Sequence, residues 1–228
     1  MRIAILGAMR EEIEPLLPKV ENLKKEEYAN NIFYTGTLSG KEIGLAYSKI
    51  GKVNAALTAT LLIEKYGCKK LLFSGVAGGI NESLKIGDLI VADKLVQHDV
   101  DITVFGHAWG FIPESGDFVE SDKELNEIAS KVAEKLGIKL IRGTIATGDQ
   151  FIASEEKKEW IKNTYKADAL EMEGASVGYV CKCLGVPFFV LRAISDTADM
   201  DAGFSFEEFL VSSAKVSANF LENILFEL

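Results

Sequence analysis

Two glutamates, Glu171 and Glu173, lie in the otherwise apolar or small-residue stretch ALEMEGASVGYV at 169–180. Carboxylates are seldom found in such a segment without a partner, because an unpaired buried charge costs several kcal/mol. In an extended chain the two side chains point to the same side, and they diverge once the chain turns helical. Glu173 stands where a helix is expected to begin, and the dipole at a helix start stabilises a carboxylate. Glu173 is therefore either a helix-start acid or a ligand-facing one, whereas Glu171 needs a buried partner.

Arg192 can supply that partner. It interrupts the apolar segment PFFVLRAIS, and a guanidinium cannot shed its charge. We expect it to pair with Glu12 or Glu171, either as a purely structural ion pair or as part of a site.

Acidic residues follow three of the predicted strands. Glu12 comes after the apolar run at 3–6, Asp196 ends the run at 187–194, and a third strand at 169–172 runs into the two glutamates. In an open α/β sheet, ligands bind beyond the carboxyl ends of the strands. The sequence therefore predicts a pocket in which these carboxylates meet.

The segment GVAGG at 75–79 follows a further predicted strand at 70–74. Its glycines allow a backbone to approach a ligand closely, but they match neither GxGxxG nor a P-loop. We interpret the segment as either a tight turn or a ligand cradle, and we expect no dinucleotide or nucleoside triphosphate site.

Other chemistries lack the residues that they require. An EF-hand that starts at Asp196 would have Ala198 and Met200 at ligand positions three and five, and one that starts at Asp199 would have Phe204 and Leu210 in place of its glycine and glutamate. Nothing near His98-Asp99-Val100-Asp101 completes a metal site. No GxSxG elbow occurs, and three cysteines are too few for a disulfide framework or a zinc site. We expect no metal and no cofactor.

The elements that must position these residues are typical of an α/β domain. A hydrophobic content of 48% with 26% charged residues suits a large core. Helices are predicted at 52–66, after a capping box formed by Ser121 with Glu124, and after a second box formed by Ser205 with Glu208. Apolar, β-branched runs predict strands at Ile3–Leu6, Lys70–Ser74, Leu89–Val96, Ile141–Thr147 and Pro187–Ile194.

Two further runs, Ile32–Leu38 and Glu42–Ser48, flank the turn Ser39-Gly40-Lys41 and predict an antiparallel hairpin. The sheet should therefore be mixed, with helices on both faces. Because no linker, repeat or low-complexity segment divides the chain, we expect one domain over 1–228.

The net charge of −9 argues against nucleic-acid binding, which needs a basic face. No apolar run reaches the length of a secretory signal or a membrane span, so we expect no membrane association, a cytoplasmic location and reduced thiols. The loop DITVFGHAWGFIP at 101–113 is too apolar for a solvated loop, and we expect it to mediate homodimerisation.

Five motifs together resemble the 5′-methylthioadenosine/S-adenosylhomocysteine nucleosidases of the nucleoside phosphorylase superfamily. They are GAMREEIEPL at 7–16, SGVAGGI at 74–80, TGDQFI at 147–152, LEMEGASV at 170–177 and RAISDTAD at 192–199. The resemblance implies a three-layer α/β/α fold around a mixed sheet, a homodimer, and hydrolysis of the N-ribosidic bond of 5′-substituted adenosines with release of adenine. The expected substrates are 5′-methylthioadenosine, S-adenosylhomocysteine and 5′-deoxyadenosine. QHDVD at 97–101 and FIPES at 111–115 resemble a subset that also cleaves 6-amino-6-deoxyfutalosine in a menaquinone pathway.

The resemblance also implies roles for individual residues. Glu12 matches the base that activates water, Asp196 matches the acid that protonates N7 of adenine, and Met172 with Glu173 matches the ribose clamp. Some members have serine where this chain has Val76. The remaining implied binding residues are Ala8, Met9, Ile50, Val76, Ala77, Gly78, Ile102, Phe151, Ile152, Arg192, Ser195 and Phe206, with Phe105 and Pro113 supplied across the dimer.

Two alternatives stay open. A phosphorylase of the same superfamily would need cationic groups near the first-strand loop, where Glu12 would repel phosphate but Arg10 would not. A non-catalytic purine-binding sensor should have lost one of Glu12, Glu173 or Asp196, and all three are present.

Overall fold

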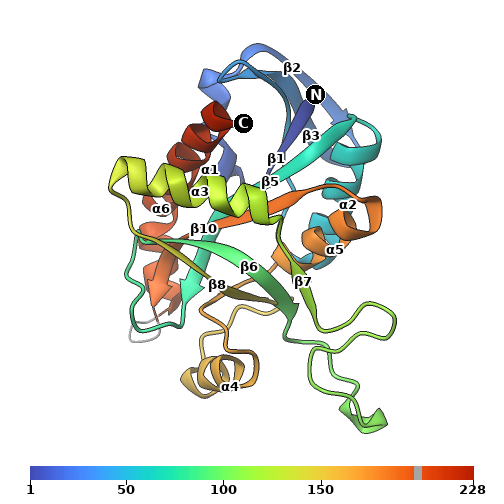
Figure 1. The fold of residues 1–228 in the computed structure, drawn as a ribbon, viewed down its shortest axis with the longest axis vertical. Helices are drawn as coiled ribbons and strands as arrows, with labels where there is room; N and C mark the ends of the chain where they lie inside the picture. Colours follow the sequence, from blue (N-terminus) through green and yellow to red (C-terminus); the bar gives the residue numbers. More distant parts are fainter. Residues whose placement is uncertain (198–201) are drawn as a thin grey trace.

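The computed structural model describes residues 1–197 and 202–228, the side chains of 202–205 excepted. A mixed sheet runs through the centre and helices cover both of its faces (Figure 1), which confirms the predicted α/β architecture. Its strands are β1 Arg2–Gly7, β2 Glu21–Tyr28, β3 Asn31–Leu38, β4 Lys41–Tyr47, β5 Cys68–Gly79, β6 Leu89–Gln97, β7 Phe118–Glu120, β8 Leu140–Thr147, β9 Ala169–Glu171 and β10 Phe188–Thr197. Its helices are α1 Arg10–Ile13, α2 Lys52–Glu64, α3 Lys123–Leu136, α4 Glu155–Tyr165, α5 Gly174–Leu184 and α6 Ala202–Glu227, with 3₁₀ turns at Leu17–Lys19 and Thr103–Phe105.

The sequence suggested an open sheet, but the sheet is partly closed. The strand order is β10-β6-β8-β9-β5-β1-β4-β3-β2, with β7 on β6, and β10 also pairs with β5. This extra pairing closes one end of the sheet into a barrel-like ring. Closure is achieved because β5 continues through GVAGG to Gly79 and stays paired in parallel with β10 as far as Thr197, with one register shift between Ile194 and Asp196. The segment GVAGG is therefore strand, which contradicts the tight-turn interpretation and leaves the ligand-cradle interpretation open.

Two apolar layers flank the sheet. On one face, α2 and α5 pack side chains such as Ala59, Leu62 and Val177 against the strands. On the other face, α3 and α6 bury Leu125 and Leu221. Burial of a leucine side chain of this kind contributes about 1.5–3 kcal/mol. The layers hold the carboxyl ends of the strands rigidly in place.

Local sequence signals placed most elements, and the errors have clear causes. Helix α3 is capped by Asp122, whose side chain accepts from Leu125 N at 2.9 Å, and not by Ser121. Helix α6 begins at Ala202, so position 205 lies inside the helix and not at its start, where the capping box was predicted. Strand β2 was not predicted, because its residues ENLKKEEY are exposed along its whole length and show no apolar alternation. Residues 198–201, part of the segment weighed as a calcium loop, lie outside the described residues.

Among the described residues, no helix combines the length and apolar character that a bilayer crossing requires. Cys68 and Cys181 are buried and free, and Cys183 is exposed and free.

Candidate active site

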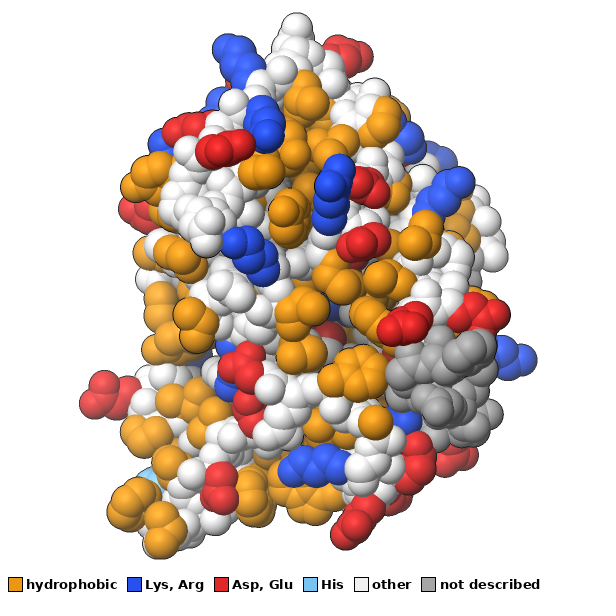
Figure 2. All heavy atoms as spheres, turned by 180° about the vertical axis from the view of Figure 1, so that it is seen from behind, with side chains coloured by type: hydrophobic (Ala, Val, Ile, Leu, Met, Phe, Trp, Pro, Cys, Tyr) orange, Lys and Arg blue, Asp and Glu red, His pale blue; other side chains and the backbone are white. Residues whose placement is uncertain are grey.

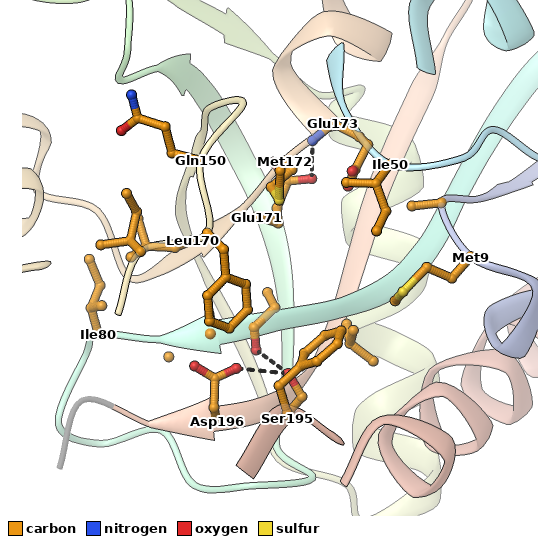
Figure 3. A pocket seen from close by; sticks show the side chains of 18 of the residues that line it. Met9, Ile50, Ile80, Gln150, Leu170, Glu171, Met172, Glu173, Ser195 and Asp196 are labelled. Carbon is orange, nitrogen blue, oxygen red and sulfur yellow. Dashed lines mark hydrogen bonds between the residues drawn. The ribbon is translucent and has the colours of Figure 1, made fainter. Parts of the chain in front are cut away.

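A cavity of about 310 Å³ lies at the carboxyl ends of the central strands (Figure 3). It is walled by the turn after β1, the end of β5, the segment after β8, the β9–α5 junction, the end of β10, and single side chains from α4 and α6. The structure brings together fourteen of the residues implied by the resemblance: Ala8, Met9, Glu12, Ile50, Val76, Ala77, Gly78, Phe151, Ile152, Met172, Glu173, Ser195, Asp196 and Phe206.

Glu12 is buried at the first turn of α1, just beyond β1. Its carboxylate accepts hydrogen bonds from Ala8 N at 2.5 Å, Met9 N at 3.0 Å and Val76 N at 2.9 Å. Burial raises the pKa of Glu12, and the nearby Arg192 charge and the three amides partly oppose the rise. A β-carbon at Gly75 would lie 2.5 Å from this carboxylate, so glycine is required there. The result is a fixed carboxylate that is a stronger base than a solvated one.

Asp196 lies near the end of β10, opposite Gly78 of β5. A β-carbon at Gly78 would lie 2.8 Å from its Oδ2. Ser195 Oγ donates to Oδ1 at 2.9 Å, as Figure 3 shows. Burial raises the pKa of Asp196, while the Ser195 hydrogen bond and the charge of Lys158 lower it. The carboxyl group can therefore hold a proton closer to neutral pH than an ordinary aspartate.

Glu173 is the N-cap residue of α5, as predicted, and it also faces the cavity. Its Oε1 accepts from Gly51 N at 2.9 Å. Burial, followed by the neighbouring Glu171 charge, raises the pKa of Glu173 to about 8, against the opposing effect of Arg192. The helix-start and the cavity-facing interpretations are thus both correct for this residue.

Glu171 is the saturated carboxylate of the pair. It accepts from Thr147 Oγ1, from Glu173 N at 3.1 Å and from Gly174 N at 2.7 Å, so it satisfies the first amides of α5. Arg192 Nη2 completes the set at 2.7 Å. The Arg192 partner predicted as Glu12 or Glu171 is therefore Glu171. Glu171 reaches the cavity wall, but its oxygens are engaged in support of the helix.

Arg192 does not line the cavity, in contrast to the prediction for it. Its side chain is 1% exposed, and its guanidinium lies 4.0 Å from the centre of the Phe73 ring. A guanidinium on a central strand can be buried only with its charge compensated, and the Glu171 pair and the aromatic face provide this behind the site.

One end of the cavity is apolar. Phe151 and Phe206 meet edge to face with ring centroids 5.6 Å apart, and Ile152 lines the same cavity. The sequence did not single out six further wall residues in these roles: Gly79, Ile80, Gln150, Lys158, Leu170 and, as a wall residue, Glu171.

Lys158 lines the cavity but was not predicted from the sequence. It is 4% exposed, and its ammonium pairs with Glu155 at 2.9 Å. Its spacing from the buried Ile161 and Tyr165 places it on the inner face of α4, and this helical periodicity is the signal that could have identified it.

Ile102, Phe105 and Pro113 lie away from the cavity of their own chain. Phe105 is 76% exposed and the neighbouring Val104 is 85% exposed. The tip of this loop projects from the body of the molecule (Figure 1), and apolar side chains gather there (Figure 2). A role across a dimer stays a prediction for Phe105 and Pro113.

His98, weighed as a metal ligand, is buried with neither ring nitrogen hydrogen-bonded within the described part of the chain. Burial lowers its pKa, and the Asp99 charge partly opposes this effect. No group of three His, Cys, Asp or Glu side chains able to hold a metal ion occurs in residues 1–197 or 202–228.

The family model described as "Phosphorylase superfamily" matches residues 2–225. The chain is 55% identical over 221 residues to the aminodeoxyfutalosine nucleosidase of Campylobacter jejuni, covering 97% of this chain and 96% of the relative. It is 39% identical over 229 residues to the 5′-methylthioadenosine/S-adenosylhomocysteine nucleosidase of Actinobacillus succinogenes, with both chains fully covered. The crystal structure of the Helicobacter pylori 5′-methylthioadenosine/S-adenosylhomocysteine nucleosidase superposes with a TM-score of 0.97 at 52% identity, covering 100% of this chain and 99% of that one.

The chain therefore belongs to the phosphorylase superfamily, and within it to the methylthioadenosine/adenosylhomocysteine and aminodeoxyfutalosine nucleosidases. The resemblance found in the sequence is confirmed, and the protein is an N-glycosyl hydrolase.

Proposed function

We propose that this protein hydrolyses the N-ribosidic bond of 5′-substituted adenosines, with Asp196 as the acid, Glu12 as the base and Glu173 as the ribose clamp. The observation that carries the proposal is the meeting of three buried carboxylates, each with a raised pKa, in one cavity. Such groups cluster where proton transfer is performed.

Asp196 acts on the leaving group. Adenine leaves poorly as an anion, so transfer of the Asp196 proton to N7 lets the C1′–N9 bond break with a neutral purine departing. The apolar base end, with Phe151 and Ile152, excludes water around the developing Asp196 carboxylate. Lys158 and the Ser195 hydroxyl stabilise that carboxylate once the proton has left.

Glu173 and Glu12 act on the sugar. As the bond stretches, positive charge builds on the ribose ring, in a state related to that of glycosidases. The Glu173 carboxyl group at the ribose hydroxyls orients the sugar, and in its ionised form it attracts that charge. Glu12 takes a proton from water as the water oxygen bonds to C1′. The three amides on Glu12 hold it in the required direction.

The substrates of the proposal are 5′-methylthioadenosine, S-adenosylhomocysteine, 5′-deoxyadenosine and 6-amino-6-deoxyfutalosine. Met9 and Ile50 lie across the cavity from Asp196 (Figure 3), and Ile50 is 51% exposed. A 5′ group directed there has an apolar wall and room to extend outward. The names of the Campylobacter and Actinobacillus relatives support the two ends of this range.

The working unit of the proposal is a cytoplasmic homodimer in which the loop at 101–113 completes the partner's cavity. The exposed Val104 and Phe105, together with Val53 at 79% exposure on α2, support an apolar interface. Free thiols support a reducing compartment. The whole chain acts as one catalytic domain, since the cavity draws walls from Ala8 through Phe206.

Product analysis with and without phosphate tests the reaction type. We expect adenine and free 5-methylthioribose from 5′-methylthioadenosine in phosphate-free buffer, at a rate that phosphate does not raise. Arg10 pairs with Glu14, and its side chain is 73% exposed, so it does not offer a phosphate site in the cavity. Phosphate-dependent formation of a sugar 1-phosphate would make the protein a phosphorylase, and tight nucleoside binding without adenine release would make it a sensor.

A further inference from the structure

The Glu173 carboxylate is held by the start of helix α2. Gly51 N donates to Glu173 Oε1 at 2.9 Å, and among the described residues it is the single hydrogen-bond donor to this carboxylate. Any movement of the Gly51 amide therefore changes where the carboxylate points.

Gly51 is the N-cap residue of α2, with φ of +99°, a conformation that favours glycine. The next amide, Lys52 N, donates to Asp149 Oδ1 at 2.7 Å. The first two amides of the helix thus bind two carboxylates from different segments of the chain, and helix N-termini stabilise such charges. Asp149 fixes the helix start beside the amide that holds Glu173.

A third residue closes the arrangement into a ring. Asp99 Oδ2 accepts from Asp149 N at 2.9 Å, and Asp99 Oδ1 accepts from Lys52 Nζ at 2.7 Å. The side chains of Lys52 and Asp99 are 17% and 13% exposed, so solvent screens this ion pair less than a surface pair. Burial raises the pKa of Asp99, but the Lys52 and Asp149 hydrogen bonds outweigh it and the net pKa is lowered. Asp99 is therefore ionised when it holds the other two residues.

We propose that Asp99, Lys52 and Asp149 form a positioning ring that fixes the Gly51 amide and, through it, the Glu173 carboxylate against the ribose. In the described part of the chain, the cavity wall includes neither Asp99 nor Lys52 nor Asp149. These residues therefore act through Glu173 and do not touch the substrate. The inference rests on the proposed function, because it needs Glu173 to be the ribose clamp. A misplacement of a catalytic group by about 1 Å costs up to about 10²-fold in rate, so a ring outside the cavity can govern turnover.

A double-mutant cycle tests the ring. Asp99→Asn removes the charge that holds Lys52 and keeps the size of the side chain. We expect it to lower kcat/KM for 5′-methylthioadenosine about 10-fold in the wild-type background, and less than about twofold in a Glu173→Gln background. Lys52→Met should reproduce the loss, and Lys52→Arg should keep most of the activity.

Asp88→Asn is the matched control. Asp88 also accepts from one backbone amide, Lys85 N at 3.0 Å, and from one lysine, Lys139 Nζ at 2.5 Å, but it does not line the cavity. We expect its kcat/KM to stay within about twofold of wild type, as for most surface changes.

The same loss from Asp99→Asn in both backgrounds would show a general structural effect and overturn the ring, as would full activity of both Asp99→Asn and Lys52→Met. Near-normal activity of Glu173→Gln alone would instead overturn the role of Glu173 in the proposed function. Thermal unfolding of each variant separates these results from loss of the fold.

Discussion

Glu171 and Glu173 stand two residues apart at the same strand–helix junction, yet their surroundings differ. Glu171 accepts from Thr147 Oγ1, two backbone amides and Arg192, whereas Glu173 accepts from Gly51 N. Burial and the Glu171 charge raise the pKa of Glu173 to about 8. A buried carboxylate with a full set of donors supports the fold, and one with spare acceptor capacity facing a cavity is available to a substrate.

The contrast extends to the groups around each carboxylate. Behind the cavity, Arg192 lies between Glu171 and the Phe73 ring and offers no route to a ligand. Inside the cavity, Asp196 has Ser195 as its hydrogen-bond partner, Gly78 beside it and the charge of Lys158 in the same cavity. Mutation of Glu171 or Arg192 should therefore lower the stability of the fold, whereas mutation of Asp196 should lower the rate of the reaction.

Glu171→Gln should produce the largest effect. It leaves the Arg192 charge buried without its carboxylate, and breaking such a pair costs about 3–5 kcal/mol. Denaturant unfolding measures the loss. Glu14→Gln, which removes the exposed pair with Arg10, should cost under about 1 kcal/mol. Equal small losses in both variants would mean that the Glu171–Arg192 pair does not support the fold.

Asp196→Asn should lower kcat at least about a hundredfold, or about 3 kcal/mol of barrier, because amide nitrogen cannot deliver the proton to N7. Its melting temperature should not fall, since no buried ion pair is broken. Steady-state adenine release and a thermal melt, run on the same preparation, measure both quantities. A variant with near-normal turnover would remove Asp196 from the acid role.

Phe105→Ala tests whether the cavity is complete within one chain. If the partner's loop closes the cavity, loss of this ring should lower kcat/KM about 10-fold, matching roughly 1.4 kcal/mol of lost apolar contact. Val211→Ala is the control, because Val211 is also exposed, at 66%, but lies on α6. Unchanged kinetics, or a monomer by light scattering at micromolar concentration, would rule out the shared cavity.

Glu173→Gln should have a small effect on stability, of the opposite sign to that of Glu171→Gln. The pKa of Glu173 is about 8 in the folded protein against 4.5 as the ordinary value. The folded state therefore holds the proton more tightly, and wild-type stability falls as pH rises from 4.5 through about 8. Above that window the variant should be more stable by about 1 kcal/mol, a modest gain because water in the cavity solvates part of the charge. Melting temperatures across pH measure it, and a variant that melts lower at every pH would contradict the comparison.

The sequence allowed prediction of the acids, because their positions at strand ends follow from periodicity alone. Glu12, Glu173 and Asp196 do meet in one cavity. Of the two interpretations of GVAGG, the tight turn was wrong, because these glycines stand in a strand where Glu12 and Asp196 approach closely. The ligand-cradle interpretation agrees with the position of Val76, Ala77, Gly78 and Gly79 on the cavity wall.

The rest depended on tertiary contacts that no local pattern encodes. Helical spacing could have placed Lys158 on the inner face of α4, but that this face borders the cavity depends on the packing of the whole chain. The ring of Asp99, Lys52 and Asp149 joins three segments through two backbone amides. Every residue except proline has such an amide, so a sequence does not indicate which amides bind a carboxylate. Closure of the sheet through β10 and β5 likewise depends on register.

The most direct measurement is a crystal structure of the Asp196→Asn protein with 5′-methylthioadenosine bound. We expect the side chain at position 196 within hydrogen-bond distance of N7, the Glu173 carboxyl group on the ribose hydroxyls, and Glu12 directed at the face of C1′ opposite the base, with distances of about 3 Å for each hydrogen bond. A nucleoside bound with its purine away from position 196, or with its ribose out of reach of Glu173, would contradict it.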